Sequence, residues 1–149
     1  DPRPGHARCL APCADCKGVK MRPTLAVLLL SVQPVLADPR LAGEFQGTIW
    51  SGVDAPGTTV LTVEPDGRIH GDYRYNDGAG EAGGRLTDCS YAILMLRCRW
   101  HDAFGSGPLV LRFAPDFQSF RGSWYDISLP EPHDRPEGGY LWTGSRPSG

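Results

Sequence analysis

A pattern of apolar, polar, small, polar and apolar positions recurs four times along the chain. It reads FQGTI at 45–49, IHGDY at 69–73, LRCRW at 96–100 and FRGSW at 120–124. Side chains alternate between the two faces of a β-strand, so the apolar and small residues of each copy share one face. A small residue in mid-strand permits tight coiling or the close approach of a neighbour. The intervening polar residues are expected to face away from the core: His70, Asp72, Arg97, Arg99, Arg121 and Ser123.

Four more apolar segments lie between these copies, at 58–63, 84–88, 109–113 and 140–146. Turn-forming sequences separate the segments: PDG at 65–67, NDG at 76–78, FGSG at 104–107 and EGG at 137–139. The pattern therefore predicts an all-β fold of eight antiparallel strands. Eight such strands with one apolar face close into an up-and-down barrel, which removes exposed edges. A β-sandwich is the alternative.

The predicted strands also repeat at a longer period of 50 residues. Trp50 aligns with Trp100, 60–61 (VL) with 110–111 (VL), and 65–66 (PD) with 115–116 (PD). Gly71 and Tyr73 align with Gly122 and Trp124 after one inserted residue. A barrel of two similar four-stranded halves is expected, with repeats at about 45–94 and 95–146.

The region before these strands has the three parts of a signal peptide. Arg22 supplies a positive charge, 24–32 (TLAVLLLSV) is apolar, and 35–37 (VLA) is typical of a cleavage site. The apolar run is short for a bilayer span, and a buried helix is the other alternative. We expect residues 1–20 to be an upstream extension, 21–37 the signal peptide and 38–149 an exported, periplasmic or secreted domain. Cleavage is expected between Ala37 and Asp38, leaving no membrane span in the mature chain.

Three cysteines in the stretch CLAPCADC have the spacing C-x3-C-x2-C, which radical enzymes use to hold a [4Fe–4S] cluster. Cys9, Cys13 and Cys16 precede the predicted signal peptide, and an exported β domain follows it. Cluster enzymes need a large domain that shields the cofactor, and aspartate stands at position 15, where these enzymes usually place an aromatic residue. The sequence therefore predicts no cofactor.

The net charge of the predicted mature domain limits the classes of partner that it can bind. Residues 38–149 hold ten arginines, no lysine and fifteen acidic residues, a net charge of −5. This balance argues against a nucleic-acid-binding face. The absence of lysine in this region removes Schiff-base chemistry and a Walker-type phosphate loop.

Aromatic residues are the candidates for a ligand site in the predicted barrel. An eight-stranded barrel is either filled by its own side chains or holds one small ligand. Arg146 could contribute a polar group to such a cavity, or could close one end of the barrel over a tryptophan as a cation–π plug. The candidate ligand-binding residues are Trp50, Tyr73, Tyr75, Trp100, Trp124, Trp142 and Arg146.

Cys89 and Cys98 are the cysteines that remain after the predicted cleavage. A lone pair in an exported domain indicates a disulfide. If residues 90–91 formed the hairpin turn, Cys98 would lie about 20 Å along the next strand at about 3.3 Å per residue. A disulfide therefore requires a turn nearer 92–94, or a bend in the chain.

Residues 45–73 resemble the opening of the avidin/streptavidin family and of other secreted lipocalin-like barrels. The shared features are FQGTIW at 45–50, the strand and turn 58–67, and IHGDY at 69–73. The resemblance implies that Tyr73 and Thr58 contact a ligand. The sequence departs from the family pattern at 50–54, where the expected asparagine is absent, and at Tyr75, which replaces a small hydroxyl residue. Barrel architecture is the part of the resemblance that transfers.

The sequence supports two functional hypotheses. The first is a non-catalytic barrel that binds a small apolar or aromatic ligand at its open end, with loops 51–57 and 127–138 as the rim. The second is an inhibitor-type barrel that binds an envelope protein through loop 127–138, where three prolines pre-order the backbone. His101–Asp102 and His133–Asp134 are expected to be solvated turn residues, because no nucleophile with a positioned base accompanies them.

Overall fold

The computed structural model describes residues 36–149. The cysteine motif, the upstream extension and all but the last two residues of the predicted signal peptide lie outside them. A short 3-10 helix, η1 (Pro39–Leu41), precedes eight strands. These are β1 (Gly43–Trp50), β2 (Asp54–Val63), β3 (Ile69–Asn76), β4 (Glu81–Ala92), β5 (Met95–Asp102), β6 (Gly105–Phe113), β7 (Ser119–Trp124) and β8 (Tyr140–Ser145).

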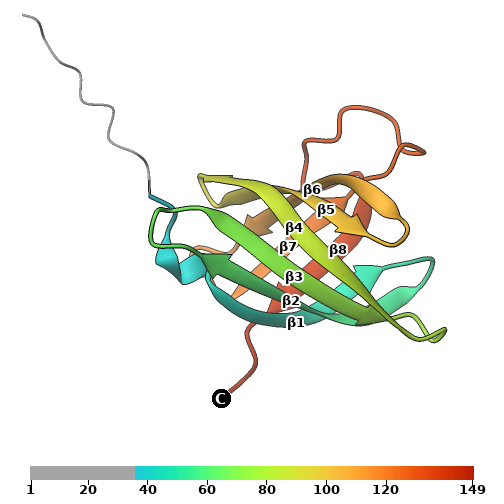
Figure 1. Ribbon diagram of the computed structural model, residues 1–149, viewed down its shortest axis with the longest axis horizontal. Helices are drawn as coiled ribbons and strands as arrows, with labels where there is room; N and C mark the ends of the chain where they lie inside the picture. The colour runs from blue at the N-terminus through green and yellow to red at the C-terminus, as the bar shows by residue number, and fades with distance from the viewer. Residues whose placement is uncertain (1–35) are drawn as a thin grey trace, which may run out of the picture. The chain divides into compact units, whose positions relative to one another are not determined.

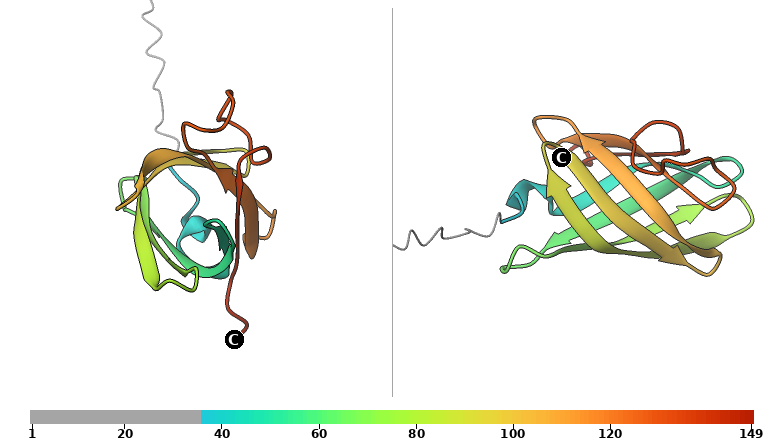
Figure 2. Two further views of the ribbon diagram at one scale, coloured as in Figure 1. Left: turned by 90° about the vertical axis from the view of Figure 1, so that its right-hand side faces the viewer. Right: turned by 90° about the horizontal axis from the view of Figure 1, so that it is seen from above.

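The eight strands form one closed antiparallel barrel in chain order, as Figures 1 and 2 show. β8 returns to pair with β1, with Gln46 opposite Ser145 and Ile49 opposite Trp142. The predicted all-β, eight-stranded up-and-down barrel is therefore confirmed, and the sandwich is excluded. No helix among residues 36–149 is long and apolar enough to cross a membrane.

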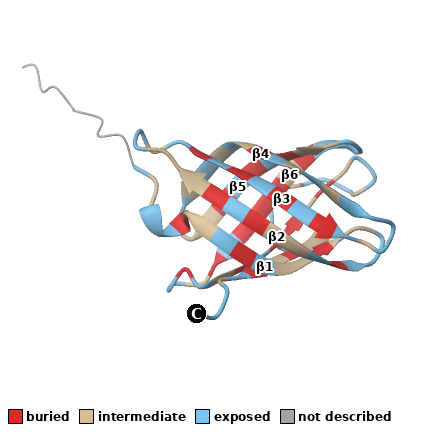
Figure 3. Ribbon diagram, turned by 60° about the horizontal axis from the view of Figure 1, so that its bottom comes forward, coloured by how far each residue is buried: buried red, intermediate tan, exposed pale blue. Residues whose placement is uncertain are grey.

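Alternation along the strands builds the barrel interior. β3 is the clearest case, because Ile69, Gly71, Tyr73 and Tyr75 are buried and the residues between them are exposed. Figure 3 shows this alternation as bands across the strands. Ser123 was predicted to face outward with the other polar residues, but it is buried. The β7–β8 connection covers it, and its hydroxyl donates to the Pro136 carbonyl.

The two halves of the barrel use glycine in the same way. A Cβ on Gly71 would lie 2.6 Å from the Val60 carbonyl oxygen, and one on Gly122 would collide with the carbonyl of Val110. Each glycine sits opposite a leucine of the preceding strand, in the pairs Gly71–Leu61 and Gly122–Leu111. The aligned positions of the 50-residue repeat thus make equivalent close contacts between strands.

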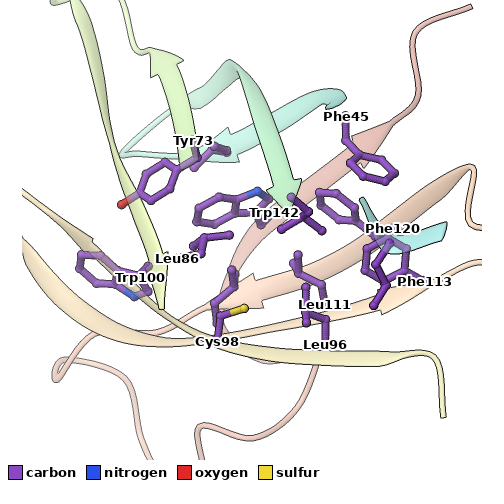
Figure 4. Close-up of a cluster of buried hydrophobic side chains, with 14 of the residues drawn as sticks. Phe45, Tyr73, Leu86, Leu96, Cys98, Trp100, Leu111, Phe113, Phe120 and Trp142 are labelled. Carbon is purple, nitrogen blue, oxygen red and sulfur yellow. The ribbon is translucent and has the colours of Figure 1, made fainter. Parts of the chain in front are cut away.

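One end of the barrel is filled by phenylalanines. Phe45, Phe113 and Phe120 pack with ring centroids 5.2–5.7 Å apart, and Phe117 lies 5.9 Å from Phe113. η1 lies at this end, where Leu41 is fully buried. Figure 4 shows Phe45, Phe113 and Phe120 on one side of Trp142, with Tyr73 and Trp100 on the other. The phenylalanines therefore occupy one end of the interior, and Tyr73, Trp100 and Trp142 occupy the other.

Cys89 and Cys98 form a disulfide between β4 and β5, with Cα atoms 4.1 Å apart. The connecting turn is Ile93–Leu94, both with positive φ. The register between β4 and β5 shifts near the disulfide: Ser90 pairs with Arg97, and the next pair is Thr87 with Arg99. The shift makes a β-bulge that leaves Asp88 and Cys89 opposite Cys98. The predicted disulfide is confirmed, through the later of the two expected turns.

Candidate functional site

The other end of the barrel contains an open cavity of about 240 Å³. It lies where β1, β3, β5 and β7 end, on the side opposite η1. Six of the seven predicted ligand-binding residues line it: Trp50, Tyr73, Tyr75, Trp100, Trp124 and Trp142. The remaining lining residues are Ile49, Ser51, Gly52, Asp102 and Phe104.

Both halves of the repeat contribute to this cavity. Trp50 and its repeat partner Trp100 line it, as do Tyr73 and its partner Trp124. The two members of each pair lie on equivalent strands, β1 with β5 and β3 with β7. Tyr73 and Trp124 occupy matching inward positions, two residues after Gly71 and Gly122, whereas Trp50 follows the inward Ile49 and reaches the cavity from the end of β1.

Hydrogen bonds hold three of the four indoles in place. Trp100 Nε1 donates to the Tyr125 carbonyl, Trp124 Nε1 to the Trp50 carbonyl and Trp142 Nε1 to Thr59 Oγ1, each at 2.9 Å. Because these N–H groups already have acceptors, the three indoles offer a ligand mainly ring carbon atoms. The arrangement suits apolar and aromatic contacts.

Contacts between aromatic rings hold Trp50, the fourth cavity tryptophan, and its neighbours in place. Trp50 lies parallel to Tyr140, with centroids 4.4 Å apart, and Trp124 contacts the same tyrosine at 4.6 Å. Trp100 meets Trp124 edge to face at 5.2 Å. Tyr140 on β8 therefore supports two cavity tryptophans without lining the cavity itself. A wall built in this way is largely formed before any ligand enters.

A polar pair crosses the cavity from β3 to β5. Tyr73 pairs with Gly84 on β4, and Gly84 pairs with Asp102 on β5, so the three residues form one cross-strand row. A Cβ on Gly84 would lie 2.7 Å from the Tyr73 hydroxyl. The glycine thus leaves room for Tyr73 Oη to reach over β4 and donate to Asp102 Oδ2 at 2.9 Å.

The environment shifts the acidity of both cavity tyrosines. Burial, followed by the hydrogen bond to Asp102 and the charge of that carboxylate, raises the pKa of Tyr73 well above the usual range. Burial also raises the pKa of Tyr75; a hydrogen bond with Ser51 opposes this shift, and the charges of Asp102 and Asp77 add smaller upward contributions. Both phenols are therefore neutral at physiological pH and can donate a hydrogen bond.

The raised pKa of Tyr73 predicts a loss of stability in alkali. Below about pH 10 the phenol is protonated in both states, so the free energy of unfolding gains no pH dependence from it. Above about pH 10 the unfolded chain releases this proton and the folded chain keeps it, so stability falls as pH rises. Tyr73→Phe should reduce this fall by up to about 1.4 kcal/mol per pH unit. Urea unfolding between pH 8 and pH 11 measures it, and parallel curves for the two proteins across that range would contradict it.

Two residues predicted near a ligand lie elsewhere. Arg146 is at the filled end, where its guanidinium sits 4.6 Å from the centre of the Phe45 ring and donates to the carbonyls of Arg40, Ala42 and Phe117. Arg146 therefore closes one barrel end as a cation–π plug, but the predicted tryptophan partner is wrong, because the ring beneath it is Phe45. Thr58 faces outward, and the inward position on β2 belongs to its buried neighbour Thr59. A shift of one residue along a strand exchanges the two faces.

Asp102 is the cavity residue that the sequence interpretation missed. It was expected to be a solvated turn residue, because glycines at 105 and 107 suggested a turn over 104–107. β5 instead continues to Asp102, and the turn is Ala103–Phe104. Asp102 is two positions after the buried Trp100, so strict alternation would have placed it on the inner face. The Phe104 amide donates to its Oδ1 at 2.8 Å.

The 127–138 loop does not form the expected rim. It stands out from the barrel wall in Figure 1, and Ile127, Leu129 and His133 border a surface groove with Arg99 and Pro108 on the outside of β5 and β6. Tyr125 anchors the loop, since its hydroxyl donates to the carbonyls of Arg135 and Glu137. The mouth of the cavity is instead bordered by Ser51, Gly52 and Phe104.

No family model matches the chain, and no curated protein or solved structure is significantly similar to it. The likeness of residues 45–73 to the avidin/streptavidin opening therefore stays a resemblance of motif. Among residues 36–149, no group of three or more His, Cys, Asp or Glu side chains is arranged to hold a metal ion. The aromatic cavity with its Tyr73–Asp102 pair is the feature on which a functional proposal can be built.

Proposed function

We propose that this chain is a non-catalytic β-barrel that binds a small apolar or aromatic ligand at its open end. One observation carries the proposal. All four tryptophans of the chain and two tyrosines line a single open cavity, while phenylalanines fill the opposite half of the barrel. A barrel that needed only a packed interior would gain stability by filling both halves, because unfilled apolar space is destabilising.

The size of the cavity limits the ligand. At about 240 Å³ it exceeds the cavity of about 150 Å³ that takes up benzene in an engineered protein. It is smaller than the typical pocket for a drug-sized molecule, which begins at about 300 Å³. A single aromatic ring with a short side arm fits these limits.

We propose further that the protein works outside the cytoplasm, as a periplasmic or secreted protein. The Cys89–Cys98 disulfide is typical of an oxidising compartment. The pattern of residues 21–37 supports export by a signal peptide.

Intrinsic fluorescence tests the ligand proposal directly, because every tryptophan of the chain lies at the cavity. A neutral probe such as 2-phenylethanol should change the tryptophan emission with saturation. Ser51→Phe places a ring at the cavity mouth and should weaken probe binding at least tenfold. Ser145→Phe adds the same ring at an exposed position of β8 and should leave binding unchanged. Equal binding by both variants and the wild type would contradict the proposal.

A second candidate function is the binding of an envelope protein through loop 127–138. The observation in its favour is Ile127, which is fully exposed on a loop that Ser123 and Tyr125 tie to the barrel. An exposed apolar residue on an anchored loop suits a protein contact. Native mass spectrometry of the protein purified from its own cells separates the two functions. A retained small molecule supports the first, and a co-purifying protein that Ile127→Asp releases supports the second.

A further inference from the structure

Asp102 gives the aromatic cavity a negative charge. It is the one charged residue among the side chains that line the cavity, and all others are aromatic, aliphatic or small. A carboxylate is costly to place beside apolar groups unless hydrogen bonds or a counter-charge compensate it. Asp102 is half-buried and keeps two such hydrogen bonds, so its carboxylate can remain charged while part of it is accessible to a ligand.

The protein holds this carboxylate but does not neutralise it. The Tyr73 hydroxyl and the Phe104 amide each donate one hydrogen bond, to Oδ2 and Oδ1 respectively. A carboxylate has about four acceptor sites, so about two remain for a ligand. None of the ion pairs formed within residues 36–149 includes Asp102. The two donors fix the orientation of the carboxylate, and its charge is left without a cationic partner in this part of the chain.

The aromatic walls of the cavity also favour a positively charged ligand. The faces of Trp and Tyr rings carry negative potential and attract a cation, most strongly where water is excluded. Asp77, in the β3–β4 turn at this end of the barrel, adds a second negative charge that also acts on Tyr75. An anion entering the cavity would meet repulsion from both carboxylates and from the ring faces.

We propose that the cavity binds a protonated amine carried on a small aromatic or apolar body, with Asp102 as its counter-ion. The ammonium group would donate to the free lone pairs of the carboxylate, and the apolar body would lie against the tryptophans. This inference rests on the proposed function, that the cavity is a ligand site, and it adds the chemical class of the ligand. Asp102 then determines specificity by charge, and the tryptophans contribute affinity through apolar contact.

Three probes of similar size and different charge test the inference on the full chain. They are phenethylamine, 2-phenylethanol and 3-phenylpropanoate, each titrated at pH 7.5 and low salt with calorimetry and tryptophan fluorescence. A hydrogen bond to a charged partner predicts that the amine binds at least about tenfold more tightly than the alcohol. The propanoate should bind most weakly. Because all three probes are compared on the wild-type protein, the ranking does not depend on whether a variant folds.

Asp102→Asn supplies the matched change in the protein. The amine should lose about tenfold or more in affinity, while the affinity of the neutral alcohol should change by less than about threefold. Asp116→Asn removes the same charge at the filled end, where Asp116 caps the β6–β7 turn. This control should leave all three affinities unchanged, and so separates the local carboxylate from net charge.

The outcomes distinguish this inference from the proposed function. Equal affinity for amine and alcohol, or a preference for the propanoate, overturns the cationic ligand and leaves the small-ligand function standing. An amine preference that survives in Asp102→Asn also overturns the role of Asp102. Failure of all three probes to bind overturns both, because a ring of this size should then have no site in the cavity.

Discussion

Replacing Trp142 with alanine is expected to lower the free energy of unfolding by about 4 kcal/mol. The indole is 1% exposed and lies between the filled half of the barrel and the cavity. It donates to Thr59 Oγ1 and meets Tyr73 edge to face at 4.8 Å. Removing it deletes these contacts and joins the cavity to a new void, which the closed barrel can relax to fill only in part. Guanidinium unfolding followed by circular dichroism measures the loss.

A conservative variant shows how much of this loss of stability comes from the deleted side-chain volume. Trp142→Phe keeps most of the ring but removes the hydrogen bond to Thr59, so about 1–2 kcal/mol should be lost. Ile127→Ala removes a fully exposed apolar side chain and should change stability by less than about 0.5 kcal/mol. A loss below about 1.5 kcal/mol for Trp142→Ala would contradict the central position of this indole in the packing.

Removing the disulfide is expected to cost about 2.5 kcal/mol. Cys89 and Cys98 are nine positions apart, and a crosslink that closes a loop of this length restricts the unfolded chain by about that amount. The variant Cys89→Ala/Cys98→Ala avoids placing a hydroxyl at the buried Cys98 position. Urea unfolding with and without a reductant measures the effect, since the wild type should lose the same stability on reduction.

Two comparisons control this experiment. The alanine pair should be insensitive to the reductant, and Ser90→Ala on the exposed face of β4 should change stability by less than about 0.5 kcal/mol. The wild type retaining its full stability in reductant would mean that the Cys89–Cys98 bond does not constrain the chain.

Periodicity made the barrel predictable. The four copies of the apolar–small–apolar pattern lie on β1, β3, β5 and β7, and the four remaining segments lie on the other strands. Each strand has one buried face, so a two-residue period in the sequence contains the orientation of its side chains. The same alternation places Tyr73, Tyr75, Trp100, Trp124 and Trp142 on the inner face, whereas Trp50 follows the inward Ile49 and reaches the cavity from the end of its strand. The sequence interpretation placed Arg146 correctly only in its alternative role as a plug.

Features that depart from the two-residue alternation of buried and exposed positions, or that mark where a strand ends, were not predictable. Ile93 and Leu94 form a turn with positive φ although neither is a typical turn residue, so no local signal marked it. The bulge at Asp88–Cys89 then adds one residue to β4, and the register between β4 and β5 follows from both. Asp102 was missed because the glycines after it suggested an earlier end to β5.

The sequence by itself determined the strand count and most of the inward residues, because alternation is a property of neighbouring positions. Only the tertiary structure decided which half of the interior is filled, since that depends on which end of each strand meets η1 and Arg146. Tertiary structure also brought Tyr73 to Asp102 across Gly84, three residues from three strands. Their meeting depends on the register of the β3–β4 and β4–β5 pairs, which is not encoded within any single segment of the chain.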